Sequence, residues 1–147
     1  MRTKLPLLAG LLLAPVAGVA LGVWTAFFDV GPAVLAVLLT IASFAIVVAT
    51  LSAGRLIGAE RNPVALGLGG LLSGMMTLGV AGGVSLAIHR ARGGFLNFEA
   101  FDSQGEMAAA LLGIHLGVGA VAGLGVGMGL ALLLPLARRL DRRAQSA

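Results

Sequence analysis

Four long apolar stretches alternate with short polar segments along this chain of 147 residues. The stretches cover residues 5–28, 33–53, 63–88 and 107–137, and none of them contains Asp, Glu, Lys or Arg. A helix needs about 20 residues to cross a hydrocarbon core of ~30 Å, and every stretch reaches that length. The pattern predicts an all-α integral membrane protein, a four-helix bundle made of two transmembrane hairpins in a single domain.

Composition agrees with this prediction and excludes several other classes of protein. Only 11% of the residues are charged, whereas soluble domains carry about 25%. The chain has no Cys, which excludes disulfides and thiolate chemistry. The net charge of +4 comes from basic residues at the predicted helix ends, where they determine membrane topology. We therefore expect no binding of nucleic acid.

The basic residues are distributed unequally between the two ends of the predicted helices. Of the ten Lys and Arg residues, only Arg90 and Arg92 lie on the side of the 89–106 loop, and the other eight lie in the N-terminal segment, the 54–62 turn and the 138–147 tail. Positively charged loops stay in the cytoplasm. We therefore expect both termini to be cytoplasmic, in a bacterial inner membrane.

Local signals mark several helix ends. Asn62 followed by Pro63 is typical of an N-cap and a first helical residue. Ser103 and Glu106 have the spacing of a capping box immediately before the fourth apolar stretch. Pro32 marks the start of the second helix, and Pro15 predicts a kink in the first.

Small residues at helical spacing predict close packing between the helices, because lipid tails are as apolar as Leu and burial alone cannot drive association. In the first helix, every fourth position is small: Gly10, Ala14, Gly18, Gly22 and Ala26. Helix-packing glycines are also expected in the third and fourth helices, at Gly70, Gly74, Gly113, Gly117, Gly119, Gly123, Gly125, Gly127 and Gly129.

The glycines of the fourth helix surround most of its circumference, which predicts contact with two or more helices of this bundle or of another subunit. We accordingly expect Leu at position 117, 123 or 127 to disrupt the bundle or its oligomer.

Few polar residues within the spans have candidate chemistry. His115 lies inside the fourth span and His89 just beyond the third, so a metal site or a haem held by both is one hypothesis. His115 lies eight residues into its span, a rise of ~12 Å, so the two histidines differ in depth and a haem held by both is disfavoured. We expect no metal and no cofactor. We also expect no catalytic residue, because the spans contain no nucleophile–base pair and no pair of acids. The hydroxyls of Thr40, Ser43 and Thr50 either line a pore or bond to the helices.

Two segments outside the spans are expected to contact lipid. Phe95, Phe98 and Phe101 recur every third residue in the 89–106 loop, which predicts an amphipathic turn at the outer interface or a docking surface for a protein. The basic tail at 138–147 is suited to anionic headgroups, through Arg138, Arg139, Arg142 and Arg143.

These observations favour a non-enzymatic membrane protein that packs through its small-residue faces, as a homo-oligomer or as an accessory subunit of a larger membrane complex. Its expected partners are membrane lipids and itself or other membrane subunits. An oligomeric channel or transporter for small solutes is the alternative, and a haem- or metal-binding protein of the outer leaflet is a third hypothesis.

Overall fold

The computed structural model describes residues 4–28, 31–93 and 103–145, without the side chains of residues 139, 141–143 and 145. Within these ranges the chain forms four α-helices: α1 (Lys4–Phe27), α2 (Pro32–Leu56), α3 (Pro63–Ala91) and α4 (Gln104–Gln145). The all-α prediction is confirmed, and all four helices are long and apolar enough to be candidate membrane spans. This result suggests an integral membrane protein.

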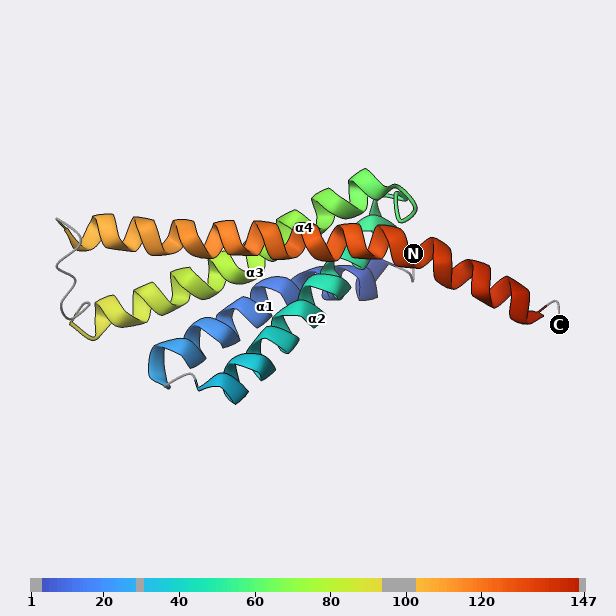
Figure 1. Ribbon diagram of the computed structural model, residues 1–147. Helices are drawn as coiled ribbons and strands as arrows, with labels where there is room; N and C mark the ends of the chain where they lie inside the picture. Colours follow the sequence, from blue (N-terminus) through green and yellow to red (C-terminus); the bar gives the residue numbers. More distant parts are fainter. Residues whose placement is uncertain (1–3, 29–30, 94–102, 146–147) are drawn as a thin grey trace.

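The helices form two hairpins that meet along α3 (Figure 1). In one hairpin α3 and α4 run antiparallel, and in the other α1 and α2 run antiparallel and cross α3 obliquely. α3 contacts each of the other three helices, whereas no Cα atom of α1 comes within 8 Å of a Cα atom of α4 in the described ranges. The bundle is therefore open, with α3 as its centre.

The predicted helix ends are confirmed where side chains define them. The Asn62 side chain accepts hydrogen bonds from the backbone N–H groups of Val64 (2.9 Å) and Ala65 (3.3 Å), with Pro63 as the first helical residue. Ser103 Oγ accepts from the N–H of Glu106 at 3.1 Å. These bonds satisfy N–H groups that have no partner within the helix. Local sequence is sufficient to place such caps.

A glycine ends α2. Gly58 has a φ of +66°, and its N–H donates to the carbonyl of Arg55 while that of Ala59 donates to the carbonyl of Gly54. This pair of bonds defines a Schellman motif, which needs a left-handed residue that glycine adopts without steric cost. The tight turn that follows brings α3 back beside α2.

The buried core consists mainly of small residues, and the large apolar side chains lie outside. Ala14, Ala49 and Thr77 are almost fully buried, whereas Val121 is 75% exposed and Leu132 is 73% exposed. Soluble monomers rarely expose such large apolar surfaces. The distribution agrees with helices that pack through small residues and present large ones to hydrocarbon.

α4 is longer than the other helices and continues through the basic tail to Gln145. Its C-terminal part bends and projects beyond the ends of the other three helices (Figure 1). Pro135 lies inside this part of the helix, where it removes one backbone hydrogen bond and favours a bend.

Candidate functional site

The closest contact between helices joins the backbones of α3 and α4. A Cβ atom added to Gly74 would lie 2.8 Å from the Cα of Gly123, and one added to Gly70 would lie 2.8 Å from the backbone nitrogen of Gly127. Real Cβ atoms essentially never come so close to other heavy atoms. Glycine is therefore the only residue that these positions accept without a shift of the helices.

The contacts are reciprocal. The Cβ position of Gly70 points at the carbonyl oxygen of Gly123, and that of Gly123 points at the carbonyl oxygen of Gly70. Gly74 and Gly119 face each other in the same way. A glycine Cα hydrogen occupies each of these positions, so the pairs form Cα–H···O contacts, each worth roughly 0.5–1 kcal/mol. The matched steps of four residues establish the antiparallel register.

The glycines expected to pack fall into two groups. Gly70, Gly74, Gly119, Gly123 and Gly127 lie in the α3–α4 contact, and a Cβ at Gly127 would strike the backbone of Leu66 and Gly67. A Cβ at the remaining four would meet no described atom within 4 Å: Gly113, Gly117, Gly125 and Gly129. Those four have open space beside them in the single chain, and α4 is the least buried of the four helices.

The small residues of α1 serve two different neighbours. All five positions expected from the sequence are buried: Gly10, Ala14, Gly18, Gly22 and Ala26. A Cβ at Gly10 would strike the Ser52 hydroxyl of α2, and one at Gly22 would lie 2.5 Å from the carbonyl oxygen of Ala81 in α3. α1 therefore contacts both α2 and α3 through one stripe.

The two histidines lie at different levels of the α3–α4 hairpin. His115 Nδ1 lies 2.8 Å from the carbonyl oxygen of Leu111 in its own helix, and its ring fills the space beside Gly82, whose Cβ would lie 2.7 Å from His115 Cγ. His89 follows Gly82 by seven residues, about 10 Å along α3. This separation does not favour a single metal ion held by both rings, since Zn–N distances are about 2.0–2.1 Å.

Threonine hydroxyls within the helices bond to their own backbone. Thr50 Oγ1 donates to the carbonyl of Ile46 at 2.6 Å, Thr77 Oγ1 to that of Ser73 at 2.9 Å, and Thr40 Oγ1 to that of Ala36 at 2.8 Å. Thr50 and Thr77 are also fully buried. The hydrogen bonds and burial of Thr50 and Thr77 together favour a packing role over the lining of a pore, whereas Thr40 is exposed.

The structure shows an arginine–aromatic contact at the end of the α1–α2 hairpin that was not predicted from the sequence. Arg92 Nη1 donates to the carbonyl oxygen of Ala26 at 3.1 Å, and its guanidinium carbon lies 5.1 Å from the centre of the Phe27 ring. Beside it, the rings of Trp24 and Phe28 are 4.6 Å apart. The run of aromatic residues at the end of the first apolar stretch is the signal that could have identified this end.

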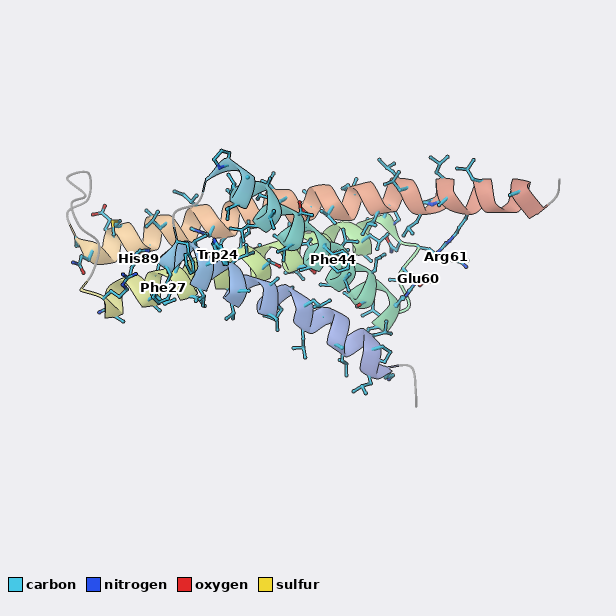
Figure 2. The ribbon with its side chains drawn as sticks, turned by 90° about the horizontal axis from the view of Figure 1, so that it is seen from below. Trp24, Phe27, Phe44, Glu60, Arg61 and His89 are labelled. Atoms are coloured by element: carbon cyan, nitrogen blue, oxygen red, sulfur yellow. The ribbon has the colours of Figure 1, made fainter. Side chains whose placement is uncertain are left out.

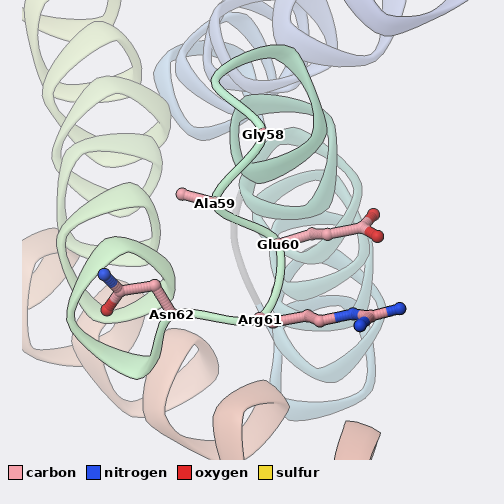
Figure 3. A pocket seen from close by; sticks show the side chains of 5 residues that line it. All are labelled: Gly58, Ala59, Glu60, Arg61 and Asn62. Atoms are coloured by element: carbon pink, nitrogen blue, oxygen red, sulfur yellow. The ribbon is translucent and has the colours of Figure 1, made fainter.

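The opposite end carries exposed charges. Figure 2 shows Glu60 and Arg61 at this end, whereas Trp24, Phe27 and His89 gather toward the other. The residues of the α2–α3 turn line an open polar pocket of about 580 Å³. The side chains of Glu60 and Arg61 point away from α3 (Figure 3). Arg55 Nε lies 3.4 Å from Glu60 Oε2. Such an exposed ion pair contributes little to stability.

Some expected lipid contacts fall on parts of the chain that are not described. Phe95, Phe98 and Phe101 lie outside the described residues, as do the side chains of Arg139, Arg142 and Arg143. The helix that carries this basic segment is described, and Arg138 is partly buried on it. Contact of these residues with headgroups stays a prediction.

Comparison with known proteins supplies no relative from which a function could be transferred. No protein-family model matches the chain, and neither a curated protein nor a solved structure does. Function must therefore be inferred from the residues themselves.

Proposed function

We propose that this chain is a small membrane protein that works through helix association rather than catalysis, as a homo-oligomer or as an accessory subunit of a larger membrane complex. In this proposal both termini are cytoplasmic and the membrane is a bacterial inner membrane. The unequal distribution of Lys and Arg along the sequence supports that orientation.

The observation that carries the proposal is the incomplete coverage of α4. One face pairs with α3 through Gly119, Gly123 and Gly127, while Gly117 and Gly125 lie beside open space. Small residues on a membrane helix let a second backbone approach. An open glycine gains no such packing and is a poor helix former. Another helix, from a second copy or from a partner subunit, would fill that space.

The mass of the gently solubilised complex tests this proposal. We expect wild type to exceed the mass of a monomer, and Gly117→Leu or Gly125→Leu to lower the mass while the chain keeps the helical circular dichroism of wild type. Gly83→Leu is the control for the residue change itself, because Gly83 lies on α3 and not on the proposed association face of α4. A wild-type protein that is monomeric and free of partner subunits contradicts the proposal.

Flux through liposomes separates this function from a channel or transporter. The proposal predicts that purified protein leaves the permeability of vesicles to ions and small solutes unchanged. Selective flux that depends on the protein would replace helix association with transport as its function. Because the described threonine hydroxyls bond to their own helices, we expect no polar path along them.

A further inference from the structure

An apolar groove lies where α1, the C-terminal half of α2 and the middle of α3 meet. Its volume is about 550 Å³, within the range of roughly 300–1,000 Å³ that ligand sites occupy. Ala14 and Pro15 come from α1, Ala53 from α2, and Gly69 and Ser73 from α3. It is separate from the α3–α4 glycine contact and from the open face of α4.

Small residues create the groove. Ala14 is 1% exposed, and a Cβ at Gly69 would lie no closer than 3.7 Å to Thr50 Cγ2 and 3.9 Å to Ala53 Cβ. These are ordinary van der Waals distances, so position 69 has room for a methyl group without a shift of α2, and Gly69 itself lines the groove. Larger side chains form the rim instead: Leu12 is 61% exposed and Leu72 is 63% exposed.

The chemistry of the lining determines what the groove accepts. Ser73 is the one residue with a polar side chain among those that line it, and the lining is otherwise apolar. An apolar cavity does not hold water stably. Since the rim residues Leu12 and Leu72 are exposed on helices that are candidate membrane spans, we expect a molecule to enter the groove from the hydrocarbon layer. A flexible hydrocarbon chain meets both conditions.

A charged residue, Lys4, lies beyond one end of the groove. It precedes Leu11 by seven residues, and Leu11 lines the groove. That spacing places both residues on the same face of α1, about 10 Å apart along the axis. Lys4 is exposed, so its ammonium group is available to a phosphate. Basic residues near a membrane surface favour anionic lipids by about 1 kcal/mol each.

We propose that this groove binds one acyl chain of an anionic phospholipid, whose phosphate group lies against Lys4. The acyl chain lies between the α1–α2 hairpin and α3, contacts both, and fills the groove that their side chains leave open. The inference concerns the region between the hairpins and does not depend on whether α4 associates with another subunit.

Retention of lipid by the full-length protein tests the proposal. Purified wild type, exchanged into detergent with phosphatidylglycerol or phosphatidylcholine, is examined by native mass spectrometry. We expect one retained lipid per chain, with phosphatidylglycerol preferred. In Lys4→Gln, we expect the lipid to remain and the preference for phosphatidylglycerol to disappear. A folded wild type that retains neither lipid overturns the proposal.

Filling the groove should release the lipid. Leu at position 69 displaces several methylene groups of the bound chain, and losing two of them weakens retention about tenfold. Ala53→Leu fills the same space from α2 and should act in the same way. Gly83→Leu, a Gly-to-Leu change in α3 outside the groove, should retain lipid like wild type.

Two further outcomes would overturn the inference. One is retention at the wild-type level in Gly69→Leu and Ala53→Leu while both keep the helical circular dichroism of wild type. The other is a lipid-free dimer that Gly69→Leu dissociates, because a second copy of the chain would then occupy the groove. That second result would still support self-association.

Discussion

Neighbouring glycines on α4 differ in what surrounds them. Gly123 faces the backbone of α3, with Gly74 Cα 2.9 Å from its Cβ position, whereas Gly125, two residues later, has no described atom within 4 Å. The two positions share a residue type and a helix. They differ in direction, since two residues correspond to about 200° around an α-helix. Substitutions at this pair therefore separate packing from helix propensity.

We expect Gly123→Ala to lower the stability of the helix bundle by about 1–3 kcal/mol, because the facing backbone cannot rotate away as a side chain would. In chains that the detergent has separated into monomers, Gly125→Ala should leave stability unchanged or raise it slightly, because no described atom lies within 4 Å of its Cβ position and Ala is the better helix former. Thermal unfolding in detergent, followed by circular dichroism, measures both. Equal melting temperatures for the two variants would mean that α3 and α4 are not in backbone contact.

The sequence could predict which residues are small but not which of them meet a neighbouring helix. The packing face of α1 could be predicted because its small residues recur at every fourth position on one side of the helix. On α4 the glycines point in most directions, so the partner helix decides which are buried. His115 illustrates the same limit. Its place beside Gly82 depends on the register of two helices, which local sequence does not encode.

Arg92 should stabilise the junction of α1 and α3. Arg92→Met removes both the hydrogen bond to the Ala26 carbonyl and the contact with the Phe27 ring, and we expect a loss of about 1 kcal/mol at this exposed site. Arg92→Lys keeps the charge but not the planar guanidinium, so it should retain part of this energy. Thermal unfolding measures the differences, and full stability in Arg92→Met would contradict this role.

At the scale of single elements, the predicted and observed helices agree closely. The third helix begins at Pro63 as expected, because the cap at Asn62 and the first helical residue at Pro63 determine this helix start locally. The largest differences occur at polar ends: α4 begins at Gln104 and runs to Gln145, beyond the predicted apolar span. Hydropathy predicts where a span crosses lipid, whereas backbone hydrogen bonding decides where a helix stops.

The N-cap of α3 offers a test at this scale. Asn62→Ala removes an acceptor used by two backbone N–H groups and should cost about 1 kcal/mol, whereas Asn62→Gly should cost only a few tenths. Hydrogen exchange of the amides of Val64 and Ala65 reports the loss directly. Unchanged exchange in Asn62→Ala would show that the cap does not protect this helix end.

For the whole molecule, the four helices were predictable but their arrangement was not. An open bundle centred on α3 arises because α3 has small residues facing α1 as well as α4: Ala81 meets Gly22 on one side and Gly74 meets Gly123 on the other. Each contact requires a matching partner on another helix. The groove between Ala14, Ala53 and Gly69 is a consequence of that arrangement and has no signature along the chain.

The distribution of charge predicts the topology of the whole chain. Reporters fused after Ala147 or inserted within residues 54–62 should report the cytoplasm, and a reporter within residues 93–105 should report the outside. The physical reason is that short loops rich in Lys and Arg are retained in the cytoplasm. Any other pattern would contradict the orientation of the proposed function.

The pairing of α3 with α4 through glycines also has an entropic consequence. A buried Leu or Met gives up rotamer freedom, whereas Gly has no side-chain freedom to lose. Helices that already span a membrane before they associate have also ordered their backbones. Bringing Gly70 and Gly74 against Gly119 and Gly123 therefore carries almost no conformational penalty. The contact between the α1–α2 hairpin and α3 also includes a larger side chain, because Leu21 lies in one buried cluster with Ala42 and with Ala81 of α3. Leu21 regains rotamer freedom when the hairpin separates from α3. Heating should therefore loosen the α1–α2 hairpin from α3 first, while α3 and α4 remain together as a pair.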